Sequence, residues 1–309
     1  KFIGVKCVDS SFKSLFKSCY GYDKSKENEF DMLIVDEAHR LPKTIDYFGK
    51  IPGSIIRGII CASKVSVFFI DEKQIVDLRD AGTIADIERI GHESNADVHN
   101  FELNAQFRCS GSDEYLNWLN HLLQYDGLHP IKLSGTTYDF KLFDSPSELM
   151  AEIKKRNRWR NKSRVVAGFC WDWVSKDNPK VKDIVIGDDF AYQWNLSLDY
   201  TWCISKGAVD QIGCIHRCQG LELDYVGVII GEDLVFCDGM IKVAPHKRSS
   251  DDRTIDGWAN LRQEKGEGGD AILRAIIKNT YRTLMTRGMK GCYVYVCDEK
   301  LRNYIKQWI

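Results

Sequence analysis

The sequence lacks the segments that would place it in or across a membrane. It has no apolar run approaching the roughly 18 residues that a membrane helix needs, and it has no signal peptide. Its eleven cysteines include no C-x-x-C pair, and Cys214 and Cys218 are the nearest to a cluster. We interpret them as reduced, mostly buried thiols, with a structural zinc site as the alternative. The expected location is therefore the cytoplasm, with no membrane partner.

The sequence also lacks an excess of charge of either sign, since 43 basic and 44 acidic residues give a formal net charge of −1. Any binding of nucleic acid must therefore come from a local basic patch. The length of 309 residues predicts about two domains, and the hydrophobic (44%) and charged (28%) fractions are typical of a folded globular protein. We place the boundary at the stretch 126–137, which contains glycine and proline, and this gives domains at 1–128 and 129–309.

No stretch of the sequence has the form G-x-x-x-x-G-K-S/T, in which glycine-rich backbone and a lysine hold the phosphates of a nucleotide. The glycine-rich piece at 266–270 has no Lys-Ser or Lys-Thr, and we interpret it as a flexible loop. The chain begins with Lys1, and residues 2–8 have the pattern of a short strand. We therefore expect a first sheet that is truncated at its N-terminal end.

The most informative stretch that is present is an apolar run at 32–35 that stops at two adjacent carboxylates, Asp36 and Glu37. Such a run predicts a strand that is buried on both faces of a parallel sheet. Ligands bind at the carboxyl ends of strands in open α/β sheets, where an Asp can hold magnesium and a Glu can activate water. The alternative is a strand that is followed by a solvated acidic turn.

Short apolar runs alternate with stretches of helical periodicity along the chain. The expected strands are 32–35, 65–70, 101–103, 140–143, 164–169, 212–216, 224–231 and 292–297, and the expected helices include 112–124, 270–286 and 301–308. The segments 183–202 and 236–269 have an irregular pattern. This alternation predicts an α/β fold with parallel sheets, whose strands deliver polar residues at their ends.

Five motifs stand in a fixed order: Asp36-Glu37-Ala38-His39, Asp71-Glu72-Lys73-Gln74, Gln106-Phe107-Arg108, residues 216–224 and residues 281–287. In this order they resemble motifs II to VI of superfamily 1 helicases. The sequence is similar in particular to the bacterial family of schlafen-type (group 3-like) DNA/RNA helicase domains, to which the segments 166–173, 219–231 and 286–291 correspond. The resemblance covers nearly all of residues 30–300.

The resemblance implies two RecA-like P-loop NTPase domains with parallel sheets, and ATP with Mg²⁺ in the cleft between them. Asp36 would hold the magnesium, Glu37 would activate water, and Arg108 and Arg287 would contact the phosphates. A guanidinium fork matches a phosphoryl group independently of the resemblance, because its paired donors face oxygens that carry negative charge. The further residues it implies are Gln74, Gln219, Gly220 and Glu222 as nucleotide contacts, and His39 and His216 for coupling nucleotide state to domain movement.

Each of these residues has a simpler interpretation. Arg108 could pair with an acid such as Asp113, Arg287 could favour a helix C-terminus, and Gln74 could be a loop amide. The histidines could be ordinary hydrogen-bonded residues. Seven Lys and Arg fall among the eleven residues 154–164, and they predict either a phosphate-contacting surface or a solvated helix end. The candidate nucleic-acid contacts in that run are Lys154, Lys155, Arg156, Arg158 and Arg160.

The leading hypothesis from the sequence is an ATP-dependent helicase or translocase core that acts on single-stranded DNA or RNA. The alternative is a non-hydrolysing module, derived from a helicase, that binds nucleic acid or a partner protein and could be part of a defence system. A third hypothesis is an ATPase subunit of a defence system whose effector is fused or encoded elsewhere. The missing phosphate loop favours the alternative, whereas the intact Asp36, Glu37, Arg108 and Arg287 oppose it. Residues 1–309 by themselves are expected not to hydrolyse ATP.

Overall fold

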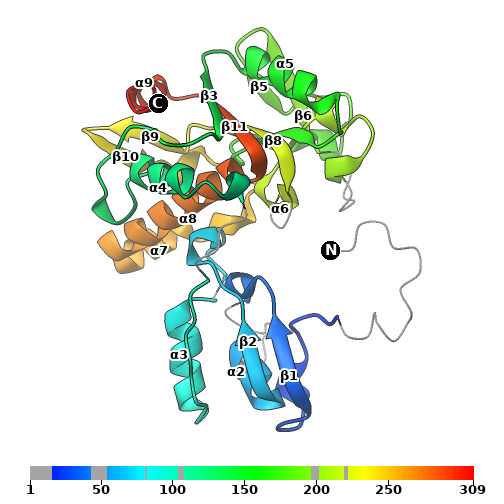
Figure 1. The fold of residues 1–309 in the computed structure, drawn as a ribbon, viewed down its shortest axis with the longest axis vertical. Coiled ribbons are helices and arrows are strands. Elements are labelled where there is room, and N and C mark those ends of the chain that lie inside the picture. The colour runs from blue at the N-terminus through cyan, green and yellow to red at the C-terminus, as the bar shows by residue number, and fades with distance from the viewer. Residues whose placement is uncertain (1–15, 43–53, 81, 104–107, 196–201, 219–221) are drawn as a thin grey trace. The chain divides into compact units, whose positions relative to one another are not determined.

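The computed structural model describes residues 16–42, 54–80, 82–103, 108–195, 202–218 and 222–309 (Figure 1). The chain divides into two compact units, Lys1–Leu103 and Asn104–Ile309, and each unit is described here by itself. The sequence placed a boundary after residue 128, whereas the two compact units divide between Leu103 and Asn104. The strand expected at 2–8 lies outside the described residues.

The first unit contains a pair of parallel strands and two helices on the described part of the chain. Strand β1 (Phe30–Val35) pairs with β2 (Ser63–Phe68), so that Met32 lies opposite Val65. Helix α2 (Ile55–Ala62) begins where the Ser54 hydroxyl accepts the Arg57 N–H, and α3 (Ile84–Glu93) begins at the corresponding cap from Thr83. The apolar residues of α2 pack on the strands, and the core consists of Ala38, Leu41, Ile55, Ile56, Ile59 and Ile90.

Strand β1 is buried on one face, and the expectation that both faces are covered was wrong. Leu33 and Val35 pack against the core, whereas Met32 and Ile34 are 54% and 64% exposed. Successive side chains of a strand point to opposite faces, so the described helices of this unit cover only one of the two. The strand expected at 101–103 is also absent, because these residues are irregular in structure.

The second unit is organised around a seven-stranded sheet with the order β3-β11-β8-β4-β7-β6-β5. All neighbouring strands are parallel except β5 and β6, which form an antiparallel pair in the segment that the sequence left irregular. A large, mostly parallel sheet in an α/β chain is what the sequence predicted. The strands are β3 (Asp139–Phe143), β4 (Ser163–Ala167), β5 (Ile184–Ile186), β6 (Phe190–Trp194), β7 (Gln211–Gly213), β8 (Leu223–Ile230) and β11 (Gly288–Val296).

Helices cover this sheet, and one of them explains where the units divide. The described helices of the unit are α4 (Asp113–Leu122), α5 (Pro146–Asn157), α6 (Ile215–Cys218), α7 (Trp258–Lys265), α8 (Glu267–Met285) and α9 (Glu299–Lys306). In α4, the Tyr115 hydroxyl donates to the Met285 carbonyl (3.1 Å) and the Trp118 indole donates to the Trp308 carbonyl (2.9 Å). These bonds tie α4 to the last residue of α8 and to the end of the chain, so α4 belongs with the second unit.

The glycine-rich piece at 266–270 is not the loop that the sequence predicted. Helix α8 begins at Glu267 and includes Gly269. A Cβ atom on Gly269 would lie 2.6 Å from the Leu261 carbonyl oxygen of α7, so glycine lets the two helices approach closely. The nearby hairpin of β9 (Leu234–Cys237) and β10 (Met240–Val243) occupies part of the expected irregular insertion.

A buried ionic network fixes the loops that follow β8. The Arg248 guanidinium donates to Asp233 (2.9 Å) and to Asp252 (2.8 Å), and all three side chains are at most 1% exposed. Burial by itself opposes the charge, but the two carboxylates hold the pKa of Arg248 above its usual value. The Tyr281 hydroxyl also donates to Asp233, which joins the network to α8.

We expect Arg248→Met to destabilise the second unit by about 3–5 kcal/mol, because it leaves two carboxylates buried without their cation. Chemical denaturation of the chain measures this loss. Lys247→Gln is the matched control, since Lys247 pairs with Glu232 at the surface and its replacement should leave the denaturation midpoint nearly unchanged. Equal stabilities of the two variants would contradict a structural role for the network.

Candidate functional site

The two predicted carboxylates lie at the carboxyl end of β1, in a turn that is held to the end of β2. The Phe69 N–H donates to the Val35 carbonyl (2.9 Å), and the Ala38 N–H donates to the Phe69 carbonyl (2.8 Å). Glu37 has a left-handed backbone conformation (φ 53°), and its N–H donates to Asp36 Oδ1 (2.9 Å). The turn therefore presents both carboxylates at the edge of the sheet where α/β proteins bind ligands.

The surroundings of Asp36 fit a magnesium ion that is shared with a nucleotide. Asp36 is exposed, and its Oδ2 atom has no partner among the described residues. Magnesium in nucleotide sites takes one or two carboxylates, and water and phosphate oxygens complete its shell. The described part of the chain holds no group of three or more His, Cys, Asp or Glu that would make a metal site from protein alone. Asp36 is therefore suited to holding magnesium together with phosphate.

His39 links Glu37 to the second motif of this unit. The imidazole is 2% exposed, and its Nδ1 atom accepts the backbone N–H of Asp71 at 3.4 Å. Because Nδ1 is an acceptor, the proton of the neutral ring lies on Nε2. Nε2 is 3.0 Å from Glu37 Oε2. The ring thus contacts the carboxylate that was predicted to activate water.

Gln74 is held in the same cluster by the side chain of Asp71. The Gln74 amide donates to Asp71 Oδ2 (2.8 Å), while Asp71 Oδ1 accepts the Lys73 N–H (3.0 Å). Gln74 is 3% exposed. Asp71 therefore binds His39 through its backbone and Gln74 through its carboxylate. Within the first unit, the structure brings together the predicted residues Asp36, Glu37, His39 and Gln74.

Two residues near this cluster were not predicted from the sequence. A Cβ atom on Gly82 would lie 1.9 Å from the Ala38 carbonyl oxygen and 2.6 Å from His39 Cα, so glycine allows its backbone to press on the turn. Burial, with the charge of Asp77, raises the pKa of Asp80 to about 7, and the charges of Arg40 and His39 oppose this shift. Neither residue stands in a recognisable motif, and their approach to the turn depends on tertiary structure.

Arg287 lies where three segments of the second unit meet. It is 2% exposed, its Nε donates to the Thr283 carbonyl (2.9 Å), and its own carbonyl accepts the Leu223 N–H (2.9 Å). The thiol of Cys109 contacts the neighbouring Thr286 carbonyl at 3.9 Å. These contacts join the end of α8, the beginning of β8 and the segment after Arg108.

The charge of Arg287 acts on thiols from two of these segments. Burial raises the pKa of Cys109 to about 11, against the opposing charges of Arg287, Arg108 and Arg282. Burial likewise raises the pKa of Cys218 at the end of α6, and Arg287 again opposes the shift. The positive charge of Arg287 therefore lies near both the Arg108 segment and α6, so three predicted motifs converge within the second unit.

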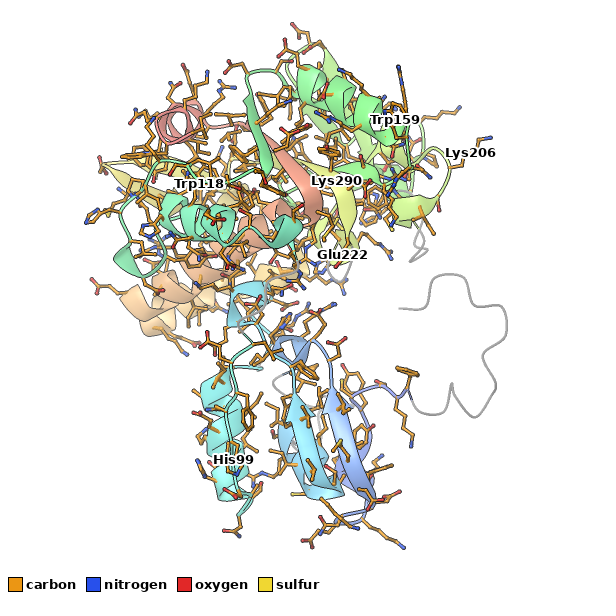
Figure 2. All side chains as sticks on the ribbon, viewed as in Figure 1. His99, Trp118, Trp159, Lys206, Glu222 and Lys290 are labelled. Carbon is orange, nitrogen blue, oxygen red and sulfur yellow. The ribbon has the colours of Figure 1, made fainter. Side chains whose placement is uncertain are left out.

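Other predicted residues are placed less centrally. His216 is exposed on α6, and Arg108 is half-buried. Glu222, which is labelled in Figure 2, is exposed just before β8. Gln219 and Gly220 lie outside the described residues. The two carboxylates and the two arginines belong to different units, so their meeting across a cleft stays a prediction.

A family model that describes the Schlafen group 3 DNA/RNA helicase domain matches residues 6–298 of the chain. The chain belongs to this family. It is also similar to an uncharacterized protein of Saccharomyces cerevisiae, with 26% identity over 334 aligned positions that cover 96% of this chain and 70% of the yeast protein. The resemblance that the five motifs indicated is thus confirmed at the level of the family.

In this Schlafen-family helicase domain, much of the basic run is neutralised by acids. Lys154 pairs with Asp210 (2.7 Å), and Lys155 lies 3.5 Å from Glu152. Arg156 binds Glu152 and Asp139 (3.0 and 3.2 Å), whereas Arg158 and Arg160 are exposed. The run is therefore not a uniform surface of free cations. Trp171 and Trp173, which are partly buried, pack against the hydrophobic core of the second unit.

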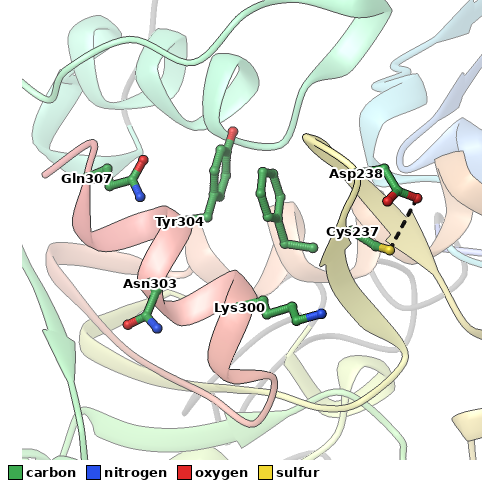
Figure 3. A pocket seen from close by; sticks show the side chains of 7 residues that line it. Cys237, Asp238, Lys300, Asn303, Tyr304 and Gln307 are labelled. Carbon is green, nitrogen blue, oxygen red and sulfur yellow. Dashed lines mark hydrogen bonds between the residues drawn. The ribbon is translucent and has the colours of Figure 1, made fainter.

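The helicase domain also has a shallow pocket of about 370 Å³ between β9 and α9 (Figure 3). The rings of Phe236 and Tyr304 stack in its wall, with centroids 4.2 Å apart. None of the predicted site residues lines this pocket. The remaining lining residues are Cys237, Asp238, Lys300, Asn303 and Gln307. Among the described residues, no helix is both long and apolar enough to span a bilayer.

Proposed function

We propose that the chain is the core of an ATP-dependent nucleic-acid helicase or translocase, in which the two compact units are RecA-like domains and ATP is hydrolysed between them. The observation that supports this most directly is the cluster at the end of β1. An exposed aspartate stands beside a glutamate, which contacts a buried histidine that is hydrogen-bonded to the next motif. Paired carboxylates in this position suit metal binding and proton transfer.

In this proposal each residue has one physical task. Asp36 would hold magnesium, which neutralises charge on phosphate oxygens. Glu37 would accept the proton of the attacking water, and His39 would keep its carboxylate in place. Arg287, together with Arg108, would donate paired hydrogen bonds to the phosphoryl oxygens from the second unit. Gln74 lies in the same hydrogen-bonded cluster as His39, so a shift of its amide on phosphate binding would reach the catalytic turn.

The function is tested by ATP hydrolysis assays on the full-length gene product with and without single-stranded DNA or RNA. We expect hydrolysis that is stimulated several-fold by a single strand. Residues 1–309 assayed alone should show no turnover, because they contain no glycine-rich loop with a lysine to position the γ-phosphate. Steady turnover by residues 1–309 would reveal a phosphate site that the motifs do not include.

The alternative function is a module that binds nucleic acid or a partner protein without hydrolysing ATP. The lack of a G-x-x-x-x-G-K-S/T sequence in residues 1–309 favours it. A full-length gene product that binds a single strand but never turns over ATP would establish this alternative. A protein partner would then be sought as the effector on which the module acts.

A further inference from the structure

The turn that joins α5 to β4 presents an unusually exposed tryptophan. Trp159 is 89% exposed, and Figure 2 shows it at the end of α5. Arg158, Arg160 and Lys162 in the same turn are also exposed, and none of them has an acidic partner within the described residues. Large aromatic side chains are seldom left this open to water, and exposed apolar groups with a polar rim mark interaction sites.

The turn is held rigidly although its tip is exposed. The Arg164 guanidinium is fully buried and donates to Asn157 Oδ1 (2.7 Å) and to Asn161 Oδ1 (2.9 Å). Asn157 Oδ1 also accepts the Ser163 N–H (3.0 Å), and Asn161 has a left-handed backbone (φ 50°). Burial lowers the pKa of Arg164 to about 10. Burying a cation among neutral acceptors costs folding free energy. The hydrogen bonds of Arg164 hold the turn in one geometry despite this cost.

A second segment brings one more cation to this surface. The Asn161 amide donates to the Ile204 carbonyl (2.9 Å), which attaches the turn to residues 202–206. Lys206 is exposed, has no acidic partner among the described residues, and lies on the same side of the unit as Trp159 in Figure 2. The surface therefore combines one flat aromatic ring with several uncompensated positive charges.

The distribution of acids distinguishes this turn from the rest of the basic run. Lys154, Lys155 and Arg156 precede it on α5, and all three are neutralised by carboxylates. The cations of the turn beside Trp159, in contrast, have no carboxylate partner among the described residues. A polyanion with accessible π-faces matches this pattern in both charge and shape, whereas a duplex keeps its bases stacked and leaves no face for the indole.

We propose that the turn 158–162 is a platform for single-stranded nucleic acid, on which Trp159 stacks against a base and Arg158, Arg160 and Lys162 contact the flanking phosphates. The platform rests on the nucleic-acid binding of the proposed function, but it does not depend on ATP hydrolysis. It lies outside the five motifs. Stacking of Trp159 on a base would bind the strand with little preference for sequence.

Fluorescence anisotropy of labelled oligo-uridine and oligo-thymidine, titrated with the 309-residue chain without nucleotide, tests the platform. Trp159→Ala should weaken binding by about 5- to 150-fold, the range for loss of one stacked base, and Trp159→Phe should retain most of the affinity. The triple variant R158Q/R160Q/K162Q should lower the slope of log affinity against log salt by about 2, since each phosphate contact with a single strand contributes roughly 0.7.

The triple variant K242Q/K247Q/K300Q is the matched control, because it removes the same charge from other elements of the second unit. It should leave the salt slope nearly unchanged. The platform is ruled out if the parent chain binds a strand and the Trp159→Ala protein binds it equally well, a result that leaves the proposed ATPase function standing. Failure of the parent to bind any strand would also overturn the platform. So would a loss of duplex affinity in the Trp159→Ala protein equal to its loss of single-strand affinity. ATP hydrolysis is scored in a separate assay.

Discussion

Glu37→Gln is expected to lower ATP hydrolysis by the full-length gene product about 100- to 10,000-fold while nucleotide binding is kept. The amide has the shape of the carboxylate but cannot accept the proton of the attacking water. Contact with His39, which lies 3.0 Å from the Glu37 carboxylate, should keep the side chain in position. Single-turnover hydrolysis and equilibrium nucleotide binding, measured on the same protein, separate the chemical step from affinity.

Glu72→Gln is the control for this experiment. Glu72 follows the end of β2, and its carboxylate accepts the Ile84 N–H at the start of α3 (2.9 Å). Its replacement removes an equal charge from the same unit and should change turnover only slightly. Hydrolysis by the Glu37→Gln protein at the parent rate would show that another group is the general base.

Arg287→Lys is expected to reduce turnover severely, because removing an arginine that stabilises a transferring phosphoryl group costs about 10³- to 10⁵-fold. Lysine keeps one positive charge near Cys109 and Cys218, so the local electrostatics that act on these buried thiols should survive. It cannot reproduce the planar fork that binds two phosphate oxygens at once. Turnover should therefore fall while circular dichroism and the denaturation midpoint stay close to those of the parent.

Arg282→Lys provides the matched comparison on the same helix. The Arg282 Nε donates to the Asn120 side chain (3.0 Å), which is a contact within the second unit. Turnover of that variant should remain within a few-fold of the parent. If the Arg287→Lys protein were as active as the Arg282→Lys protein, Arg287 would be a structural residue that closes α8 through Thr283.

The strands that carry motifs could be predicted because their apolar runs end abruptly in polar residues. This holds for β1, which ends before Asp36, and for β8 and β11 in the second unit. The exposure of one face of β1 could not be predicted, because it depends on which helices cover the sheet. The start of α8 at Glu267 was hidden by its glycines, of which Gly269 allows close packing against α7.

The proximity of Glu37, His39 and Gln74 could be predicted, but the contacts among them could not. The sequence identifies Glu37, His39 and Gln74 as candidates, whereas only the structure shows that Asp71 joins the last two. The role of Gly82 could not be predicted, because its backbone contacts a turn at Ala38 and His39 that is far away in sequence. The ion pairs of the basic run could not be predicted for the same reason, because Asp139 and Asp210, which neutralise two of its cations, lie far away in sequence.

A structure of the full-length gene product with magnesium, a non-hydrolysable ATP analogue and a single strand tests the central claim most directly. The account predicts that Asp36 lies in the coordination shell of the magnesium, that Glu37 is within hydrogen-bond reach of a water beside the γ-phosphate, and that the Arg287 guanidinium contacts the phosphate oxygens. A nucleotide bound away from Asp36, or an Arg287 guanidinium that stays enclosed within the second unit and distant from the phosphates, would contradict it.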